Sequence, residues 1–165
     1  MPTRRYDSAS QTALTGWRRH DQNAGMPPTI DLHPLRRALA VLAEAIQFWH
    51  AQPEGSALKP HLRSAVIQSF EFSYELSLRL LRRTLIERAT AADNVIDLSF
   101  NDLLRLGAVH GLLNDAVQWR QWRELRNATS HAYNEAKAQA VASRVEAFAV
   151  DAAALLTAME VQLGR

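Results

Sequence analysis

An arginine and a histidine stand five positions apart in the C-terminal half of the chain, Arg126 and His131. A neutral imidazole can remove a proton from a ribose 2′-hydroxyl, and an imidazolium can protonate the leaving 5′-oxygen. The arginine fork can neutralise the charge that grows on the phosphoryl oxygens in the transition state. One histidine cannot easily serve as base and acid in the same step, whereas two copies across a dimer axis could. The pair therefore suits cleavage of RNA without a metal ion.

The backbone between Arg126 and His131 decides whether the two side chains can meet. On an unbroken helix they would point about 140° apart. They converge only if the backbone leaves the helix between them, or if copies from two protomers meet. Thr129, Ser130 and Asn134 compete with a helix by bonding to nearby backbone groups, so a break in this segment is expected.

A purely structural role explains the same residue types. Arg126 would pair with Glu124 or Asn134, His131 would fill a polar gap, and Tyr133 would pack against its neighbours. The spacing Arg-x4-His taken alone favours this structural role, because the spacing by itself carries little specificity. Further signals from the chain must decide between the two roles.

Arginines beside this segment offer contacts to a nucleic acid. Arg120, Arg123 and Arg126 recur every three residues, next to Trp119 and Trp122. Arginine binds phosphate and aromatic faces stack on unpaired bases, so we predict that Arg120 and Arg123 contact RNA. The two tryptophans, at helical spacing, are more often part of a core.

The composition excludes several classes of site. The 165 residues contain no cysteine, and the six histidines show no paired ligand spacing, so we expect neither a metal nor a cofactor. No stretch approaches the roughly 18 apolar residues of a membrane span. No apolar run follows Arg4 and Arg5, as it would in a secretory signal. We therefore expect a cytoplasmic protein that does not enter a membrane.

The chain divides into a tail and one domain. Residues 1–28 lack apolar periodicity, end in Gly25-Met26-Pro27-Pro28, and carry four arginines against two aspartates. We interpret them as a mobile basic N-terminal tail. A plain extension is favoured over an arm that touches RNA or a partner. Residues 29–165 form the predicted domain, in which nucleic-acid binding would need a local patch rather than global charge.

Apolar periodicity predicts a long helix near each end of the domain. Pro34 suits a first helical turn, and apolar residues then recur at steps of four and three up to Trp49. Asn134 can cap the last helix, which carries a similar stripe from Val141 to Met159. In the predicted bundle the two longest apolar stripes face one another.

A second helix is expected from about Pro60 to Arg88. The strict alternation of apolar and polar residues midway along it resembles a strand, but flanks rich in helix formers, without Gly or Pro, favour a helix. Glu71 and Glu75 are expected to be structural, with Arg79 or polar groups near the Arg-x4-His segment as partners. A helix that is apolar nearly all round must be buried by its neighbours or by a dimer partner, so we predict a homodimer.

Two shorter helices complete the predicted bundle. A capping box at Ser99 and Asp102 starts one that would end at Gly107. Asn114 can cap the next, which carries the two tryptophans and should fail near Thr129. The predicted fold is an all-α, antiparallel bundle of four to five helices that forms a homodimer.

The segment Arg-Asn-x-Thr-Ser-His-x-Tyr at residues 126–133 resembles the signature of HEPN proteins of the HepT kind, which include the nucleotidyltransferase substrate-binding proteins. The stretch Phe-Glu-Phe-Ser-Tyr-Glu-Leu at residues 70–76 resembles the long central helix of that family. The resemblance covers roughly residues 32–163, and two motifs in the right order make it fairly specific. The family often has Asp after the tyrosine, where this chain has Asn134, which caps a helix equally well.

The resemblance implies a symmetric dimer whose two Arg-x4-His motifs face each other across a cleft. Catalytic members are metal-independent ribonucleases, and in toxin–antitoxin modules a small nucleotidyltransferase neutralises them by adenylylating the motif tyrosine. Carried over, Arg126 and His131 become catalytic, Asn127 and Ser130 supporting, and Tyr133 the modified residue. The implied partners are RNA, a second copy of the chain and a cognate nucleotidyltransferase encoded nearby.

Two other functions stay open at this point. The same fold could serve only as a non-catalytic substrate-binding or docking subunit of a nucleotidyltransferase, or as a helical dimerisation domain without chemistry. A docking module needs none of Arg126, His131 and Tyr133. The intact set therefore favours the ribonuclease.

Overall fold

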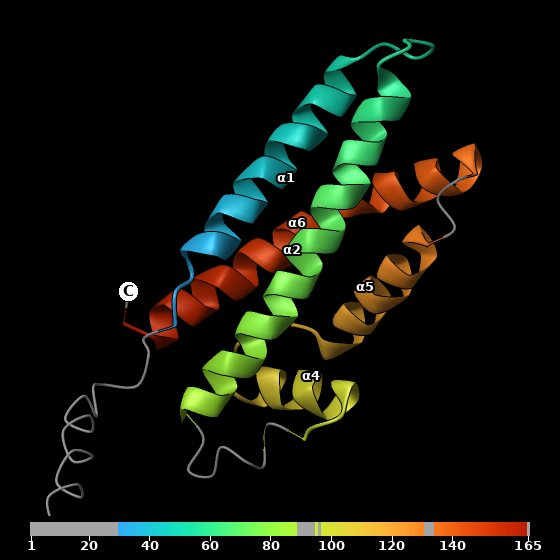
Figure 1. The fold of residues 1–165 in the computed structure, drawn as a ribbon. Coiled ribbons are helices and arrows are strands. Elements are labelled where there is room, and N and C mark those ends of the chain that lie inside the picture. Colours follow the sequence, from blue (N-terminus) through green and yellow to red (C-terminus); the bar gives the residue numbers. More distant parts are fainter. Residues whose placement is uncertain (1–29, 89–94, 96, 131–133, 165) are drawn as a thin grey trace, which may run out of the picture.

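The computed structural model describes residues 30–88, 95, 97–130 and 134–164. These residues contain five helices and no strand (Figure 1), and none of the helices is long and apolar enough to cross a membrane. In chain order they are α1 (His33–Ala51), α2 (Lys59–Arg88), α4 (Phe100–Val109), α5 (Ala116–Thr129) and α6 (Glu135–Gln162). The predicted all-α bundle is confirmed, whereas the predicted tail, residues 1–28, lies outside the described residues.

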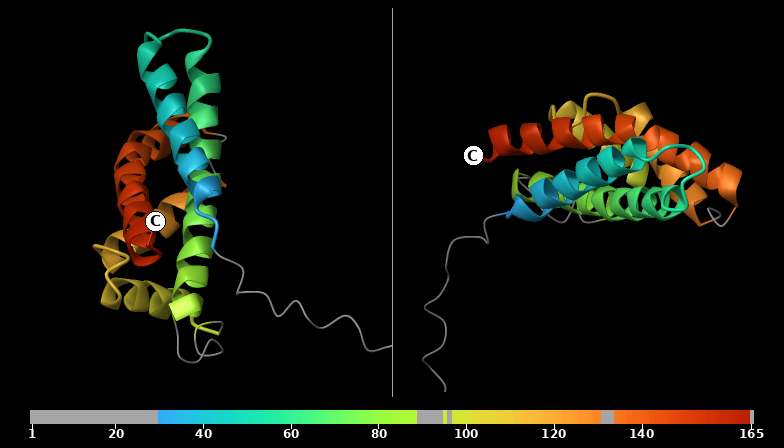
Figure 2. Two further views of the ribbon diagram at one scale, coloured as in Figure 1. Left: turned by 90° about the vertical axis from the view of Figure 1, so that its left-hand side faces the viewer. Right: turned by 90° about the horizontal axis from the view of Figure 1, so that it is seen from above.

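The second helix, α2, is the central element of the bundle. It lies beside α1 and runs in the opposite direction, and α6 crosses behind both of them (Figures 1 and 2). The short helix α4 lies near the C-terminal end of α2, and α5 leads back towards the middle of α2. As a result, α2 contacts each of the other four described helices. That position explains why its sequence is apolar nearly all round.

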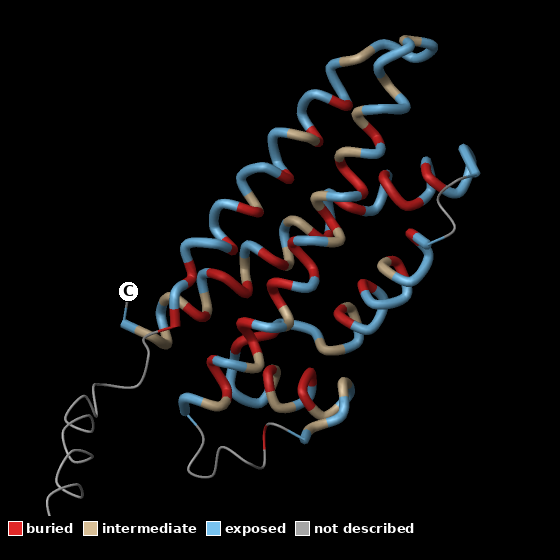
Figure 3. The backbone as a smooth tube through the Cα atoms, viewed as in Figure 1, coloured by how far each residue is buried: buried red, intermediate tan, exposed pale blue. Residues whose placement is uncertain are grey.

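Most of the cover for α2 comes from within the chain. Buried residues recur along the whole of α2 (Figure 3). Twelve of its residues are buried, and Ser73 and Ser77 are fully enclosed. Phe72 is the large apolar side chain of α2 that stays exposed, at 59%. The helix interpretation of the alternating segment is therefore confirmed. A dimer partner could therefore still cover Phe72, but most of α2 does not need one for its burial.

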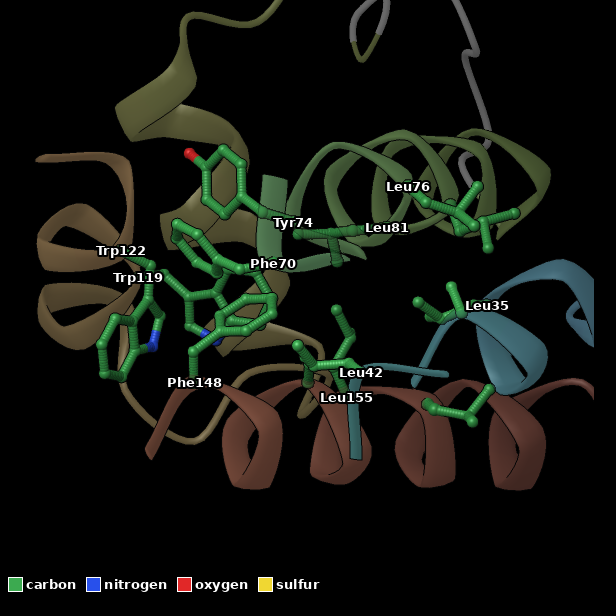
Figure 4. Packing of buried hydrophobic residues seen from close by; sticks show 14 of the residues in the cluster. Leu35, Leu42, Phe70, Tyr74, Leu76, Leu81, Trp119, Trp122, Phe148 and Leu155 are labelled. Carbon is green, nitrogen blue, oxygen red and sulfur yellow. The ribbon is translucent and has the colours of Figure 1, made fainter. Parts of the chain in front are cut away.

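Phe148 of α6 is the centre of an aromatic cluster (Figure 4). Its ring meets Phe70 edge-on with 4.9 Å between centroids, and it meets Trp122 and Trp119 at 5.9 and 6.1 Å. Both tryptophans are 2% exposed, and the indole N–H of Trp122 donates to Oδ2 of Asp151 at 2.8 Å. The tryptophans therefore belong to the core, as their spacing indicated, and offer no face to an RNA base.

The end of α4 differs from its prediction. The helix starts as expected, with the Ser99 side chain accepting from the N–H of Asp102, but it continues past Gly107. A Cβ added to Gly107 would lie 3.2 Å from two leucine side chains, so this glycine permits close packing and does not end the helix. The chain reverses at Gly111, whose φ of +68° is a conformation that favours glycine.

The next two helices begin with acceptors for their free N–H groups. Asp115, rather than the predicted Asn114, caps α5, since its Oδ1 accepts from the N–H groups of Val117 and Gln118 at 2.7 and 3.2 Å. The prediction for α6 is confirmed, because Oδ1 of Asn134 accepts the N–H three residues further on at 3.2 Å. The Asp115 cap therefore fixes where α5 begins, and the Asn134 cap fixes where the segment between α5 and α6 ends.

Candidate functional site at the end of α5

The predicted site residues that the structure describes lie along α5 and at its C-terminal end. The structure describes Arg126, Asn127, Ser130, Arg120 and Arg123. His131 and Tyr133 lie outside the described residues. The predicted end of the helix is confirmed, because α5 ends at Thr129 with Ser130 as its C-cap. Asn127 and Ser130 are both exposed there.

Arg126 is bound to α2 through a carboxylate. Its Nε and Nη2 donate to Oε1 of Glu75 at 3.1 and 2.7 Å, and its Nη1 lies 4.0 Å from Oε1 of Glu71. The hydrogen bond to Glu75 raises the pKa of Arg126 above its usual value, against a smaller opposing effect of burial. Because a third of the side chain is exposed, the charged guanidinium can be reached from solvent. The structural interpretation named Glu124 or Asn134 as its partner, and that expectation is wrong.

Thr129 makes a second link between α5 and α2. Its hydroxyl lies 2.5 Å from Oε1 of Glu71 and 2.6 Å from the carbonyl oxygen of Arg126, and its single proton is donated to one of them at a time. The expected partnership of the two glutamates with polar groups near the Arg-x4-His segment is confirmed. Within the described part of the chain, no ion pair joins Glu75 to Arg79.

Arg63 of α2 holds the start of α6. It is 7% exposed, its Nη2 lies 2.9 Å from Oε1 of Glu135, and its Nη1 donates to Oε1 of Gln139 at 3.3 Å. Its Nε is buried and has no hydrogen-bond partner among the described residues. Since α2 also binds the end of α5, this one helix holds both flanks of residues 131–133.

The exposed side of α5 carries further positive charge. Arg120 and Arg123 are exposed, and neither forms an ion pair with a described residue. The Arg123 guanidinium lies over the ring of Phe100, 4.4 Å from its centroid. Burial raises the pKa of Tyr74 to about 12, and the nearby Arg123 and Arg126 offset this only in part. The phenol therefore stays neutral and does not reduce the positive charge of this side.

The described part of the site is suited to binding an anion. An arginine fork matches the geometry of phosphate or carboxylate, and two more arginines lie on the same helix. Among the residues that the structure describes, no three His, Asp or Glu side chains are placed to hold a metal ion.

The particular partners of the two glutamates, Arg126 and Thr129, were not named from the sequence, although its spacing carries a signal for them. Glu71 and Glu75 are four residues apart, and Arg126 and Thr129 are three apart, so each pair lies on one face of its helix. The two faces match in hydrogen-bonding character, but only the packing of α2 against α5 shows that they meet. Arg63 had no comparable signal.

The fold and this polar junction define a helical bundle in which the central helix α2 binds the end of α5. Residues 30–161 match the family model described as nucleotidyltransferase substrate binding protein like. The chain belongs to this family, in agreement with the resemblance of its two motifs.

Individual relatives support the same assignment. A curated relative, the probable ribonuclease HepT of Haemophilus influenzae, is 38% identical over 101 residues, which are 61% of this chain and 69% of that protein. A solved Haemophilus influenzae structure is described as revealing the fold of a substrate-binding domain of a nucleotidyltransferase. It has a TM-score of 0.72 and 33% identity, and the match covers 82% of this chain and 100% of that chain. A crystal structure from Thermus thermophilus has a TM-score of 0.59 and 28% identity, with 79% and 99% covered.

Proposed function

We propose that the chain is a HepT-like ribonuclease of a toxin–antitoxin module, in which Arg126 and His131 cleave RNA without a metal ion. The observation that carries this proposal is the charged, solvent-reachable guanidinium of Arg126, fixed at the end of α5 and five residues before His131. A surface used only for docking would not require an arginine held in this way. The similarity to the probable ribonuclease HepT favours the same chemistry.

In the proposed reaction, His131 of one protomer removes the proton from a ribose 2′-hydroxyl. The 2′-oxygen attacks the adjacent phosphorus while the bond to the 5′-oxygen breaks. His131 of the partner subunit gives a proton to that 5′-oxygen, and Arg126 stabilises the charge on the phosphoryl oxygens. The products are a 2′,3′-cyclic phosphate, which can open to a 3′-phosphate, and a 5′-hydroxyl end.

Four exposed residues have supporting roles in this proposal. Asn127 and Ser130 lie beside Arg126 and supply polar contacts to the scissile region. Arg120 and Arg123, further along α5, contact phosphates on either side. Such contacts weaken as salt is added, so RNA binding should depend on ionic strength.

The test of catalysis compares unmodified protein with His131→Ala, Arg126→Ala and the control Arg105→Ala, which removes an exposed arginine of α4. Loss of a positioned acid or base lowers a rate about 10²–10⁴-fold, and loss of a charge-stabilising donor lowers it about 10²–10³-fold. We therefore expect the first two variants to lose RNA cleavage and the control to retain it.

Two properties of the reaction distinguish it from metal-dependent hydrolysis. Cleavage should persist in EDTA, and it should spare DNA, which lacks the 2′-hydroxyl nucleophile. Mass spectrometry of the fragments should find 2′,3′-cyclic phosphate or 3′-phosphate ends. If cleavage survives His131→Ala, the family assignment stands and the catalytic assignment fails.

We also propose that Tyr133 is a regulatory acceptor, to which a cognate nucleotidyltransferase transfers AMP from ATP with release of pyrophosphate. Incubation with that enzyme and ATP should add adenylate mass to the peptide that contains Tyr133, and Tyr133→Phe should stay unmodified. Tyr74 is 4% exposed, so Tyr74→Phe is a control that should leave the modification unchanged. Adenylate on a different residue, or on none, would exclude this form of regulation.

A second candidate function is that of a non-catalytic substrate-binding or docking subunit of a nucleotidyltransferase. The description of the family and that of the Haemophilus influenzae structure favour it. Cleavage of RNA by the unmodified dimer distinguishes the ribonuclease from the docking subunit. If protein shown by mass spectrometry to be unmodified, and by light scattering to be dimeric, leaves varied RNAs intact, the docking subunit is the better conclusion.

The proposed chemistry needs two copies of His131, so we propose a homodimer that brings them together. Phe72 is exposed on α2 one turn from Glu75, the partner of Arg126. It lines a largely apolar groove of about 550 Å³ together with Pro34 and Val41 of α1. A second copy seated on this surface would cover Phe72 and lie next to Arg126.

A further inference from the structure

The hydrogen bonds of Arg126 occupy one edge of its guanidinium and leave another edge open. Nε and Nη2 form the edge that donates to Oε1 of Glu75, at 3.1 and 2.7 Å. Nη1 makes no hydrogen bond to a described residue, and the Glu71 carboxylate lies 4.0 Å from it. The open edge, formed by Nη1 and Nη2, is the one that can bind two oxygens of a phosphate side by side.

We propose that Glu75 is a positioning residue for Arg126, which it holds so that the open edge of the guanidinium faces an RNA phosphate. The inference rests on the ribonuclease function proposed above and names the residue that prepares its arginine. An arginine side chain has many rotamers, and ordering it at the moment of binding costs free energy. A carboxylate that orders it beforehand removes that cost from the reaction.

The location of Glu75 makes it a firm anchor. It lies in the middle of α2, whose neighbouring residues Ser73, Tyr74, Leu76 and Ser77 are all buried. The backbone of Glu75 therefore cannot move without disturbing the core. Arg126 is on a different helix, so the hydrogen bond also fixes the distance between the end of α5 and α2.

Glu75 could instead compete with RNA for Arg126, but two observations oppose that role. A competing carboxylate would occupy the Nη1–Nη2 edge, whereas Glu75 occupies the Nε–Nη2 edge. Its side chain is also 57% exposed, so solvent and salt screen its negative charge from an approaching phosphate. The hydrogen bonds that it accepts should therefore matter more than its charge.

The test separates the acceptor from the charge with two substitutions. Glu75→Gln keeps an acceptor oxygen and removes the charge, whereas Glu75→Ala removes both. Glu87→Ala is the matched control, because Glu87 is an exposed glutamate of the same helix without an ion pair to a described residue. We expect Glu75→Ala to lower the single-turnover cleavage rate at saturating RNA about 10²-fold, while Glu75→Gln and Glu87→Ala keep the wild-type rate.

A second readout does not depend on catalysis. The Nε–Hε signal of Arg126 in a ¹H–¹⁵N spectrum, assigned with Arg126→Lys, should be protected from solvent exchange in the wild type and in Glu75→Gln but lost in Glu75→Ala. A 2′-O-methyl oligonucleotide, which has phosphates but no nucleophile, should shift this signal. It should bind Glu75→Ala about tenfold more weakly than wild type.

The outcomes are distinguishable. If Glu75→Ala cleaves RNA and binds the oligonucleotide like wild type, the positioning role is excluded. If Glu75→Gln is as impaired as Glu75→Ala, the charge matters and the proposal is wrong. If the wild type cleaves no RNA but Glu75→Ala alone loses oligonucleotide affinity and the protected signal, the ribonuclease function fails and the positioning role stands. Circular dichroism melts of each variant exclude unfolding as the cause.

Discussion

At the level of single residues, the site depends on two hydrogen-bonded pairs that join α2 to the last turn of α5. Glu75 binds the guanidinium of Arg126, and Glu71 lies within hydrogen-bond distance of the Thr129 hydroxyl. The first pair orders a charged arginine, and the second ties the C-terminal residue of α5 to the core helix. Removing the Thr129 hydroxyl takes a donor from the partly buried Glu71 carboxylate, and this costs more than the bond contributed. The more exposed Glu75 carboxylate can bind water instead.

Thr129→Val tests the second pair, because valine has the same shape without the hydroxyl. We expect the free energy of unfolding to fall by about 1–2 kcal/mol, since a partly buried carboxylate loses a donor. Thr157→Val is the control. Its hydroxyl is exposed and bonds only to the Ala153 carbonyl of its own helix, so the change should be within about 0.5 kcal/mol. Equal losses in urea denaturation of the two variants would show that the Glu71 contact contributes nothing.

At the level of elements, α2 fixes the ends of two other helices. Its two glutamates hold the end of α5, and its buried Arg63 holds Glu135 and Gln139 at the start of α6. The cap of α6 is local and comes from Asn134. The segment that carries His131 therefore lies between two fixed helix ends. Side chains of α2 hold the end of α5, and Arg63 of α2 together with the Asn134 cap holds the start of α6.

Asn134→Ala should lower stability by about 1 kcal/mol, because the first turn of α6 loses the acceptor for one of its free N–H groups. Asn134→Asp should keep or slightly raise stability, since aspartate caps equally well and its negative charge suits the N-terminus of a helix. Thermal and urea denaturation of both variants measure these changes. A loss of similar size in Asn134→Asp would mean that the amide group makes a contact that aspartate cannot replace.

At the level of the whole molecule, α1 and α2 form one layer and α6 crosses behind it, so that most of α2 is covered within one chain (Figure 2). The apolar side chain of α2 left exposed is Phe72, and Val41 of α1, at 49% exposed, lines the same groove. Charged and polar residues surround them on α2. This is the surface on which we propose that a second copy of the chain docks.

Phe72→Asp should convert the proposed dimer into a monomer, because a charge would be buried at the centre of the interface without a partner. Val161→Asp is the control, since Val161 is 74% exposed near the end of α6 and does not line this groove. Light scattering at micromolar concentration measures the molecular mass, and so the oligomeric state, of the wild type and of both variants. A wild-type monomer would contradict the dimer and the two-histidine reaction, and a dimeric Phe72→Asp would place the interface elsewhere.

The sequence by itself determined the fold class, the family and most helix boundaries. These features depend on local signals: apolar periodicity, the caps at Ser99 and Asn134, and residues near Thr129 that compete with a helix. Motif residues of the Arg-x4-His segment could also be named from their types and spacing, although the roles of His131 and Tyr133 stay predictions. The predicted end of α4 at Gly107 was wrong, because a glycine can serve either in a turn or in close packing. Only the neighbouring side chains in the fold decide which of the two it does.

Only the tertiary structure decided which residues hold Arg126. Its partner Glu75 is 51 residues earlier in the chain, and Glu71 is 58 residues before Thr129. The sequence could name particular partners only nearby, such as Arg79 for Glu75 and Glu124 or Asn134 for Arg126, because nearby residues are the pairs that a pattern can reveal. A charged side chain forms its hydrogen bonds with whichever partner the packing of helices brings within reach, and that packing depends on the whole core rather than on any one segment.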